Sequence, residues 1–129
     1  MELYIGGSGQ GKKEYVQACH KNKKFIVLDE QEIDMLFLKK MEGEILIDHF
    51  HAWIKNKIKE GKNPEMLTED LVLNYPDCVI ISDEIGNGLV PMEASEREYR
   101  DRTGKILIGL AKKAERVERI ICGLGQRLK

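Results

Sequence analysis

Short apolar runs alternate with longer amphipathic segments along this chain. The runs are LYI, KFIVLD, EILID, DCVIISDE and RIICGL, each bounded by turn residues or charged segments. Runs of this length and composition predict buried β-strands. Nearly all-apolar strands that alternate with helices indicate a mostly parallel sheet covered on both faces. The sequence therefore predicts an α/β fold of three layers with a central sheet of about five strands.

Three segments carry apolar residues at helical spacing. Their predicted buried stripes are Tyr15, Val16 and Cys19; Phe50, Trp53, Ile54 and Ile58; and Tyr99, Ile106, Leu110, Ala114 and Val117. Gly61 is expected to end the second helix, and Ser95, a good N-cap residue, to begin the third. The polar stretch 60–70 is expected to be a surface connection. The lysines of residues 55–63 are expected to lie on a solvated helix face.

Length and composition indicate one globular domain, residues 1–129. The chain is 42% hydrophobic and 33% charged, with a formal net charge of −1. Such a balance argues against general nucleic-acid binding, which needs a basic face. No apolar window is long enough to cross a membrane, and the N-terminal residues lead directly into a strand, so a cytoplasmic protein is expected. Cys19, Cys78 and Cys122 have no metal-site spacing and are expected to be small buried hydrophobes.

Residues 6–13, GGSGQGKK, have the length and glycine placement of a phosphate-binding loop, G-x-x-x-x-G-K-[ST]. They follow the first predicted strand and open a helix, which is the context that the motif needs. Backbone N–H groups at a helix N-terminus attract anions, and a lysine at the end of the loop can reach terminal phosphates. The predicted nucleotide-binding residues are Gly6, Gly7, Ser8, Gly9, Gln10, Gly11, Lys12 and Lys13.

Lys13 departs from the motif, because this position normally carries a hydroxyl that coordinates Mg²⁺. An ammonium group has no lone pair to offer a cation. One alternative is that other carboxylates and water hold Mg²⁺ beside ATP or GTP. Another is that Lys13 supplies positive charge in place of the metal, which gives binding with little chemistry. A third is a tight strand-to-helix turn without a ligand.

Carboxylates end two of the predicted strands: Asp48 follows EILI, and Asp83 and Glu84 follow VIIS. In a parallel sheet, ligands bind outside the carboxyl ends of the strands. Asp48, Asp83 and Glu84 are therefore candidates to hold Mg²⁺, and Asp48 and Glu84 are candidate catalytic residues that accept a proton from an attacking hydroxyl. For Asp48, capping of the next helix is the competing interpretation. His49 and His51 are expected to point in different directions, with no third ligand for a metal.

Residues 79–129 resemble the C-terminal part of the adenosylcobinamide kinase/adenosylcobinamide-phosphate guanylyltransferase family. The resemblance rests on the DEIGNGLVP turn with Pro91, on Arg100-Asp101 and Gly104, and on the RLK ending. GGSGQGKK stands where that family has its phosphate loop, and ILIDHFHAWIKNKI resembles its central strand and helix. The resemblance implies a RecA-like P-loop NTPase fold, often assembled as a homotrimer. It also implies phosphorylation of the aminopropanol hydroxyl of adenosylcobinamide by ATP or GTP, and GMP transfer through a guanylyl-histidine.

The chain departs from the family between its second and third strands. Only EQEIDMLFLKKMEG stands there, without the histidine that the family guanylylates, and His49 and His51 lie elsewhere. Gly9-Gln10 also replace a more polar, basic loop interior. The expected function is therefore kinase-like, with the guanylyltransferase half lost and residues 86–91 bordering the second substrate. The alternative is a non-catalytic relative that binds a nucleotide and acts as a regulatory protein.

Overall fold

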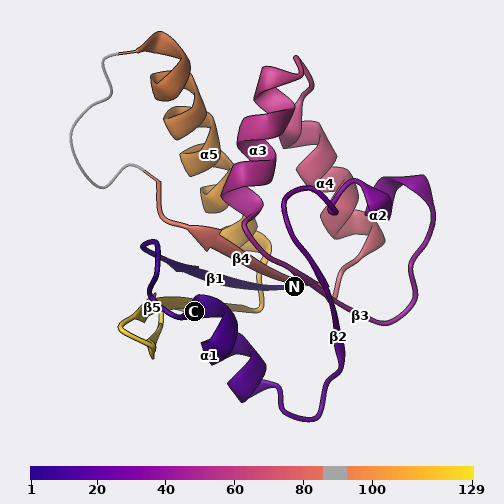
Figure 1. Cartoon of the computed structure of the whole chain (residues 1–129), viewed down its shortest axis with the longest axis vertical. Coiled ribbons are helices and arrows are strands. Elements are labelled where there is room, and N and C mark those ends of the chain that lie inside the picture. The colour runs from indigo at the N-terminus through magenta and orange to yellow at the C-terminus, as the bar shows by residue number, and fades with distance from the viewer. Residues whose placement is uncertain (86–92) are drawn as a thin grey trace.

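A six-stranded sheet in the order β2-β3-β4-β1-β5-β6 forms the centre of the computed structural model, which describes residues 1–85 and 93–129 (Figure 1). The strands are β1 (Glu2–Gly6), β2 (Phe25–Leu28), β3 (Glu44–Ile47), β4 (Val79–Asp83), β5 (Arg116–Ile121) and β6 (Leu124–Arg127). The helices are α1 (Lys12–Cys19), α2 (Met35–Leu38), α3 (Phe50–Lys59), α4 (Pro64–Asn74) and α5 (Ala94–Lys113). Strands β1 to β5 are parallel and β6 is antiparallel to β5.

The two faces of the sheet are covered unequally. Helices α3, α4 and α5 lie on one side and α1 on the other (Figure 1). Alternation along β1 divides the core accordingly: Leu3 packs into the larger cluster beneath α3 and α5, whereas Tyr4 packs with Val16 beneath α1. Trp53 is fully buried in the larger cluster, as the sequence predicts. This arrangement confirms the predicted three-layer α/β fold.

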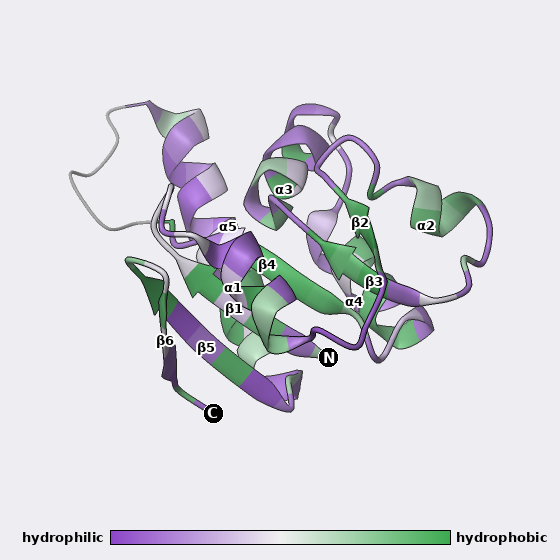
Figure 2. Cartoon of the chain, turned by 60° about the horizontal axis from the view of Figure 1, so that its bottom comes forward, coloured by the Kyte–Doolittle hydropathy of each residue, from purple (hydrophilic) through white to green (hydrophobic). Residues whose placement is uncertain are grey.

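The sixth strand was not predicted from the sequence. Cys122 and Gly123, between β5 and β6, have φ angles of 51° and 74°. Two consecutive residues with positive φ form the kind of tight turn that joins neighbouring antiparallel strands. The apolar run that we expected to close the sheet as one strand therefore folds back as a hairpin at the edge (Figure 2).

Two helix boundaries also differ from the prediction. The stretch 60–70 is not a surface connection, because α4 begins within it: Pro64 opens the helix, and the Asn63 side chain accepts a hydrogen bond from Met66 N. Helix α5 begins after Glu93 rather than at Ser95 and ends at Lys113. Its predicted stripe holds for Tyr99, Ile106 and Leu110, whereas Ala114 and Val117 are buried beyond the helix end.

Lys57 is buried, which contradicts the expected solvated lysine face at this position, whereas Lys59 and Lys62 are exposed as expected. Its ammonium group pairs with Asp34, from the segment before α2, and with Glu60 at 2.8 Å. Asp34 also accepts a hydrogen bond from Trp53 Nε1 at 2.9 Å. The sequence around Lys57 does not indicate its burial, because Asp34 lies in an earlier segment and comes near Lys57 only when the chain folds.

The cysteines divide in a way that the sequence did not predict. Cys78 is buried, as expected, and burial raises the pKa of its thiol to about 12. Cys19 and Cys122 are exposed, the first at the end of α1 and the second in the turn of the hairpin. The expectation of three buried cysteines is therefore wrong for two of them.

Helix α1 is fastened to β5 through a buried carboxylate. Glu118 accepts hydrogen bonds from the Tyr15 hydroxyl and from Arg116 Nε, both at 2.6 Å. Burial disfavours the charged form of Glu118, but these two donors outweigh it and lower the pKa of the carboxyl. A Cβ on Gly125 would collide with the Tyr15 hydroxyl, so the glycine in β6 leaves room for this contact.

Gly6 is the position at which the sheet allows no side chain. A Cβ there would lie 2.5 Å from the backbone oxygen of Ile120 in β5, whereas a Cβ on Gly7 would make an ordinary contact at 3.6 Å. We expect Gly6→Ala to destabilise the protein by about 2 kcal/mol or more, because two backbones must separate. Gly7→Ala is the matched control and is expected to unfold close to the native midpoint in urea. Equal midpoints for the two variants would contradict the close approach of β1 and β5.

The contact between Asp34 and Lys57 predicts a pH-dependent contribution to stability. Burial opposes the charged form of Asp34, but hydrogen bonds from Lys57 and Trp53 outweigh it, so the pKa of the carboxyl lies below its ordinary value. The stabilisation is then fully present above about pH 4 and is lost as pH falls through the lowered pKa. We expect Asp34→Asn to cost about 1 kcal/mol at pH 7.

The difference in unfolding free energy between Asp34→Asn and the native protein should shrink on acidification below pH 4, as measured by urea unfolding. Asp70→Asn, an exposed change on α4, serves as the control and should show neither effect. A cost for Asp34→Asn that stays constant between pH 7 and pH 3 would contradict this account.

Candidate functional site

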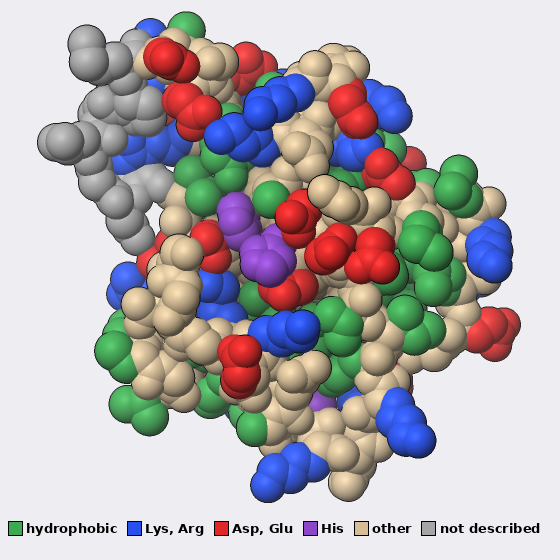
Figure 3. Space-filling view, viewed as in Figure 1, with side chains coloured by type: hydrophobic (Ala, Val, Ile, Leu, Met, Phe, Trp, Pro, Cys, Tyr) green, Lys and Arg blue, Asp and Glu red, His purple; other side chains and the backbone are tan. Residues whose placement is uncertain are grey.

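A cavity of about 430 Å³ lies at the carboxyl ends of β1, β3 and β4. Its size is in the usual range for small-molecule sites. On this side of the molecule, histidine side chains lie close to acidic and basic ones (Figure 3). The lining residues come from the predicted loop, the first turn of α1, the ends of two strands and the start of α3: Ser8, Gly9, Gln10, Gly11, Lys12, Lys13, Glu14, Asp48, His49, His51, Ile81, Ser82 and Asp83.

The predicted phosphate loop runs from the end of β1 into α1, as the motif requires. Gly9 and Gly11 have φ angles of 71° and 81°, which favour glycine over any other residue. Gly11 is the N-cap of α1 and, having no side chain, leaves the first amides of the helix without a side-chain cap. Such amides form an anion site at a helix N-terminus.

Gln10 ties the loop to the hairpin at the edge of the sheet. Its backbone oxygen accepts a hydrogen bond from Gly123 N at 2.8 Å, and its Oε1 accepts one from Cys122 N at 2.7 Å. The β5–β6 turn therefore fixes the outer part of the loop. Sequence reasoning missed this contact, because the two segments stand at opposite ends of the chain.

Lys12 is nearly buried at the base of the loop. Its Nζ donates a hydrogen bond to Gly7 O at 2.7 Å and forms an ion pair with Asp83 Oδ1, also at 2.7 Å. The structure thus joins the predicted phosphate-binding lysine to one of the predicted strand-end carboxylates. Lys13 lines the same cavity and forms no ion pair with any residue in ranges 1–85 and 93–129.

Asp48 lies at the end of β3 with its carboxylate at the cavity. Its Oδ1 accepts a hydrogen bond from the backbone N of His49, the N-cap of α3, and α3 has no side-chain cap. Asp48 is therefore not the N-cap of α3, although it binds the amide of the residue that is. His49 itself adopts a left-handed conformation with φ 55° and ψ 42°, which is uncommon for a residue other than glycine and is found at functional sites more than elsewhere.

His49 and His51 do not diverge as expected, since both line the cavity and their ring centroids are 6.0 Å apart. His51 Nδ1 accepts a hydrogen bond from Asp83 N at 3.0 Å, so the neutral ring carries its proton on Nε2. That Nε2 lies 3.4 Å from Asp83 Oδ2. Burial lowers the pKa of His51, although the nearby Asp83 carboxylate opposes the shift.

Glu84 lies outside this cavity. Its Oε1 is 2.7 Å from Arg119 Nε and its Oε2 accepts a hydrogen bond from Arg119 Nη2 at 3.1 Å, which directs the carboxylate toward β5. Its backbone N donates to Gly6 O at 2.8 Å. Asp48 and Asp83 therefore share a cavity that Glu84 does not line. Residues 86–91, which we expected to border a second substrate, lie outside the described residues.

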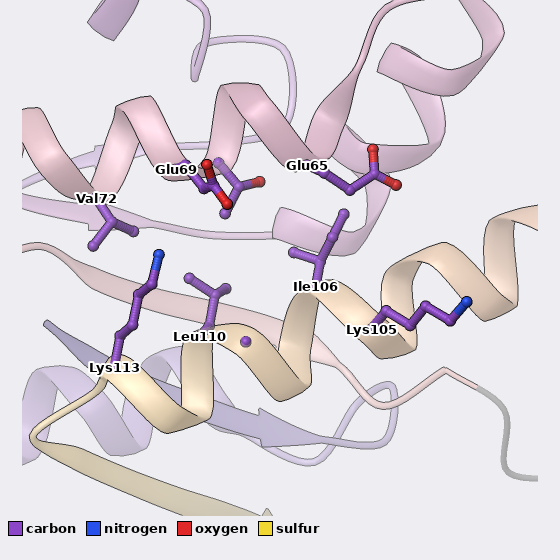
Figure 4. Close-up of a pocket in the computed structure, with 9 residues that line it drawn as sticks. Glu65, Glu69, Val72, Lys105, Ile106, Leu110 and Lys113 are labelled. Atoms are coloured by element: carbon purple, nitrogen blue, oxygen red, sulfur yellow. The ribbon is translucent and has the colours of Figure 1, made fainter.

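A second pocket, of about 180 Å³, lies between α4 and α5. Val72, Ile106 and Leu110 form its apolar part, and Glu69 and Lys113 extend from the two facing helices (Figure 4). It contains neither loop residues nor strand-end carboxylates. The larger cavity therefore gathers most of the predicted loop together with Asp48 and Asp83, whereas Glu84 lies outside it.

Within the described residues, no group of three or more His, Cys, Asp or Glu side chains is arranged to hold a metal ion. The three carboxylates predicted to hold Mg²⁺, Asp48, Asp83 and Glu84, therefore do not form such a group. No helix in the described part of the chain is long and apolar enough to cross a membrane.

Comparison with known proteins connects this geometry to a family. The family model for cobinamide kinase/cobinamide phosphate guanyltransferase matches residues 17–128. No curated protein matches the chain. The match covers α1 beyond its first turns, both strand-end carboxylates and the hairpin, and the phosphate loop precedes it. The α/β sheet is that of the P-loop NTPase fold, and the chain belongs to the cobinamide kinase/cobinamide phosphate guanyltransferase family of cobalamin biosynthesis.

Proposed function

We propose that the cavity binds ATP or GTP with Mg²⁺ and transfers the terminal phosphoryl group to the aminopropanol hydroxyl of adenosylcobinamide. The observation that carries this proposal is the meeting of a phosphate loop, Lys12 and two carboxylates in one cavity. Family membership supports the nucleotide and the cobinamide substrate. Phosphoryl transfer needs positioning and charge neutralisation rather than covalent chemistry, and this cavity offers both.

The loop amides, Lys12 and Lys13 would hold the phosphates. Asp48 lines the cavity and would accept the proton of the acceptor hydroxyl. Glu84 is the second candidate for that role. It ranks below Asp48 because Arg119 holds its carboxylate outside the cavity.

Asp48 and Asp83 are the residues suited to Mg²⁺, and Glu84 is the more distant candidate. Mg²⁺ commonly takes one or two carboxylates together with phosphate oxygens and water, so two carboxylates in a phosphate site fit a metal that arrives with the nucleotide. When bound, Mg²⁺ neutralises charge on the phosphate oxygens. Asp83 also keeps Lys12 in place through their ion pair.

The guanylyltransferase half of the family's activity is, in this proposal, lost. Residues 29–43 between β2 and β3 contain no histidine, and α2 packs Leu36 of this segment into the core. His49 and His51 lie in a different segment, between β3 and α3. We assign neither of them a covalent intermediate.

A second candidate function is a nucleotide-responsive regulatory protein without catalysis. Lys13 favours it, since this cation forms no ion pair with a described residue and lines the cavity where the motif has a metal-binding hydroxyl. In that case Lys13 would stand in for Mg²⁺. The two candidates differ in how strongly nucleotide affinity depends on the metal.

Calorimetric titration of ATP and of GTP, with Mg²⁺ and then with EDTA, tests the proposal. We expect micromolar binding that requires Mg²⁺ and that Lys12→Ala weakens by about tenfold or more, because a charge-assisted contact to phosphate is removed. Lys24→Ala, an exposed change, is the matched control and should bind as the native protein does. Cobinamide phosphorylation by the native protein and its loss in Lys12→Ala complete the test.

Binding that persists unchanged in EDTA would favour the regulatory candidate. Absence of binding to either nucleotide, with the protein folded, would contradict both candidates. It would leave the loop as a strand-to-helix turn without a ligand.

We also propose that the protein forms a homo-oligomer, for which the family resemblance implies a trimer. Supporting this, Ile108 on α5 and Leu124 and Leu128 at the hairpin are 59%, 73% and 55% exposed. We expect Leu128→Asp to dissociate the oligomer in light scattering after size-exclusion chromatography. Leu73→Asp is the matched control, because Leu73 is also an exposed leucine but lies on α4. This variant should have the same molar mass in solution as the native oligomer. A monomeric native protein would contradict the proposal.

A further inference from the structure

The ion pair between Lys12 and Asp83 places a carboxylate beside the ammonium group that a phosphate ligand would bind. Lys12 Nζ contacts two oxygens of the described residues, Gly7 O and Asp83 Oδ1, each at 2.7 Å. The lysine is 9% exposed and lines the cavity. A phosphate oxygen that approaches Lys12 therefore arrives next to the Asp83 carboxylate.

Asp83 is held in this position from two sides. Its backbone N donates to His51 Nδ1 at 3.0 Å, and its Oδ2 lies 3.4 Å from His51 Nε2. The other carboxylate oxygen, Oδ1, forms the ion pair with Lys12. The carboxylate therefore has a fixed place between Lys12 and His51.

The balance of charges that line the cavity also disfavours a bare phosphate. Two lysines, Lys12 and Lys13, face three carboxylates, Glu14, Asp48 and Asp83. A polyphosphate without a cation adds several negative charges to a lining that is already acidic, and partly buried charges are screened less than exposed ones. A ligand that brings its own divalent cation reverses this balance.

We propose that Asp83 is a specificity-determining residue that makes the cavity select metal-bound nucleotides and reject bare phosphates. The carboxylate repels phosphate oxygens that lack a cation, and it becomes a favourable neighbour when the nucleotide carries Mg²⁺. In this chain Lys13 occupies the position of the usual metal-binding hydroxyl, so the selection falls to the strand-end carboxylate. The inference rests on the proposed function, since it concerns the same nucleotide site.

Calorimetric titration of inorganic tripolyphosphate in EDTA measures the affinity of the cavity for a metal-free phosphate chain, independently of catalysis. We expect Asp83→Asn, which keeps the shape and removes the charge, to bind tripolyphosphate about tenfold or more tightly than the native protein does. With Mg²⁺ present, Asp83→Asn should bind Mg²⁺–ATP and Mg²⁺–GTP no more tightly than the native protein. The ratio of nucleotide affinities with and without Mg²⁺ should thus fall by about tenfold or more.

Asp70→Asn makes the same change of net charge on α4, away from the cavity, and should leave all these affinities as in the native protein. Asp83→Ser is the second variant, and it should give the same tightening if Asp83→Asn does not fold. Thermal unfolding without ligand identifies which variant is folded.

Tripolyphosphate affinities that are equal in the native protein and the folded Asp83 variants would overturn the inference. If the native protein still binds Mg²⁺–nucleotide, the proposed function survives that result. Tightened tripolyphosphate binding by the variants, with no Mg²⁺–nucleotide binding by the native protein, would support only the repulsion of bare phosphates by Asp83. It would overturn the proposed function and, with it, the selection of metal-bound nucleotides. Weaker binding of tripolyphosphate to the variants would also overturn the inference, because it would make Asp83 a phosphate-supporting residue.

Discussion

The close approach of β1 to β5 at Gly6 is the constraint on which the candidate site depends. The Ile120 oxygen occupies the space that a side chain at Gly6 would need. On the opposite side, Gly6 O accepts the backbone N–H of Glu84, which follows β4. One residue without a side chain thus aligns the ends of three neighbouring strands. The phosphate loop starts from this point, so its position relative to Asp83 follows from backbone packing.

Charged groups in the cavity and beside it are arranged in compensated pairs. Lys12 is matched by Asp83, Glu84 by Arg119, and the polar contact of His51 is directed to Asp83. Buried or half-buried charges are tolerated when they are paired and hydrogen-bonded. Lys13 stands apart, because no such partner holds it among the described residues. This contrast makes Lys12 a positioned group and leaves Lys13 available to an incoming anion.

Family membership and geometry contribute different parts of the functional picture. The family match begins at residue 17, after the phosphate loop, so it supports the carboxylate-bearing strands and the hairpin rather than the loop itself. The loop is supported by its own geometry: left-handed glycines, a helix N-terminus without a side-chain cap, and a buried lysine. The two lines together are the basis on which a nucleotide site and a kinase-like function are proposed, while the covalent guanylyl step is not.

The sequence by itself determined the α/β class, the places of the five parallel strands along the chain, the glycine-rich loop between β1 and α1, and the strand-end positions of Asp48 and Asp83. These features are local: apolar runs, helical spacing and glycine placement report on neighbouring residues. Only the tertiary structure decided that Glu84 turns to Arg119, that both histidines line the cavity, that Lys57 is buried against Asp34, and that Gln10 is held by the Cys122–Gly123 turn. Each of these joins segments that are distant in the chain, and no local pattern records which distant partner a polar side chain will meet after folding.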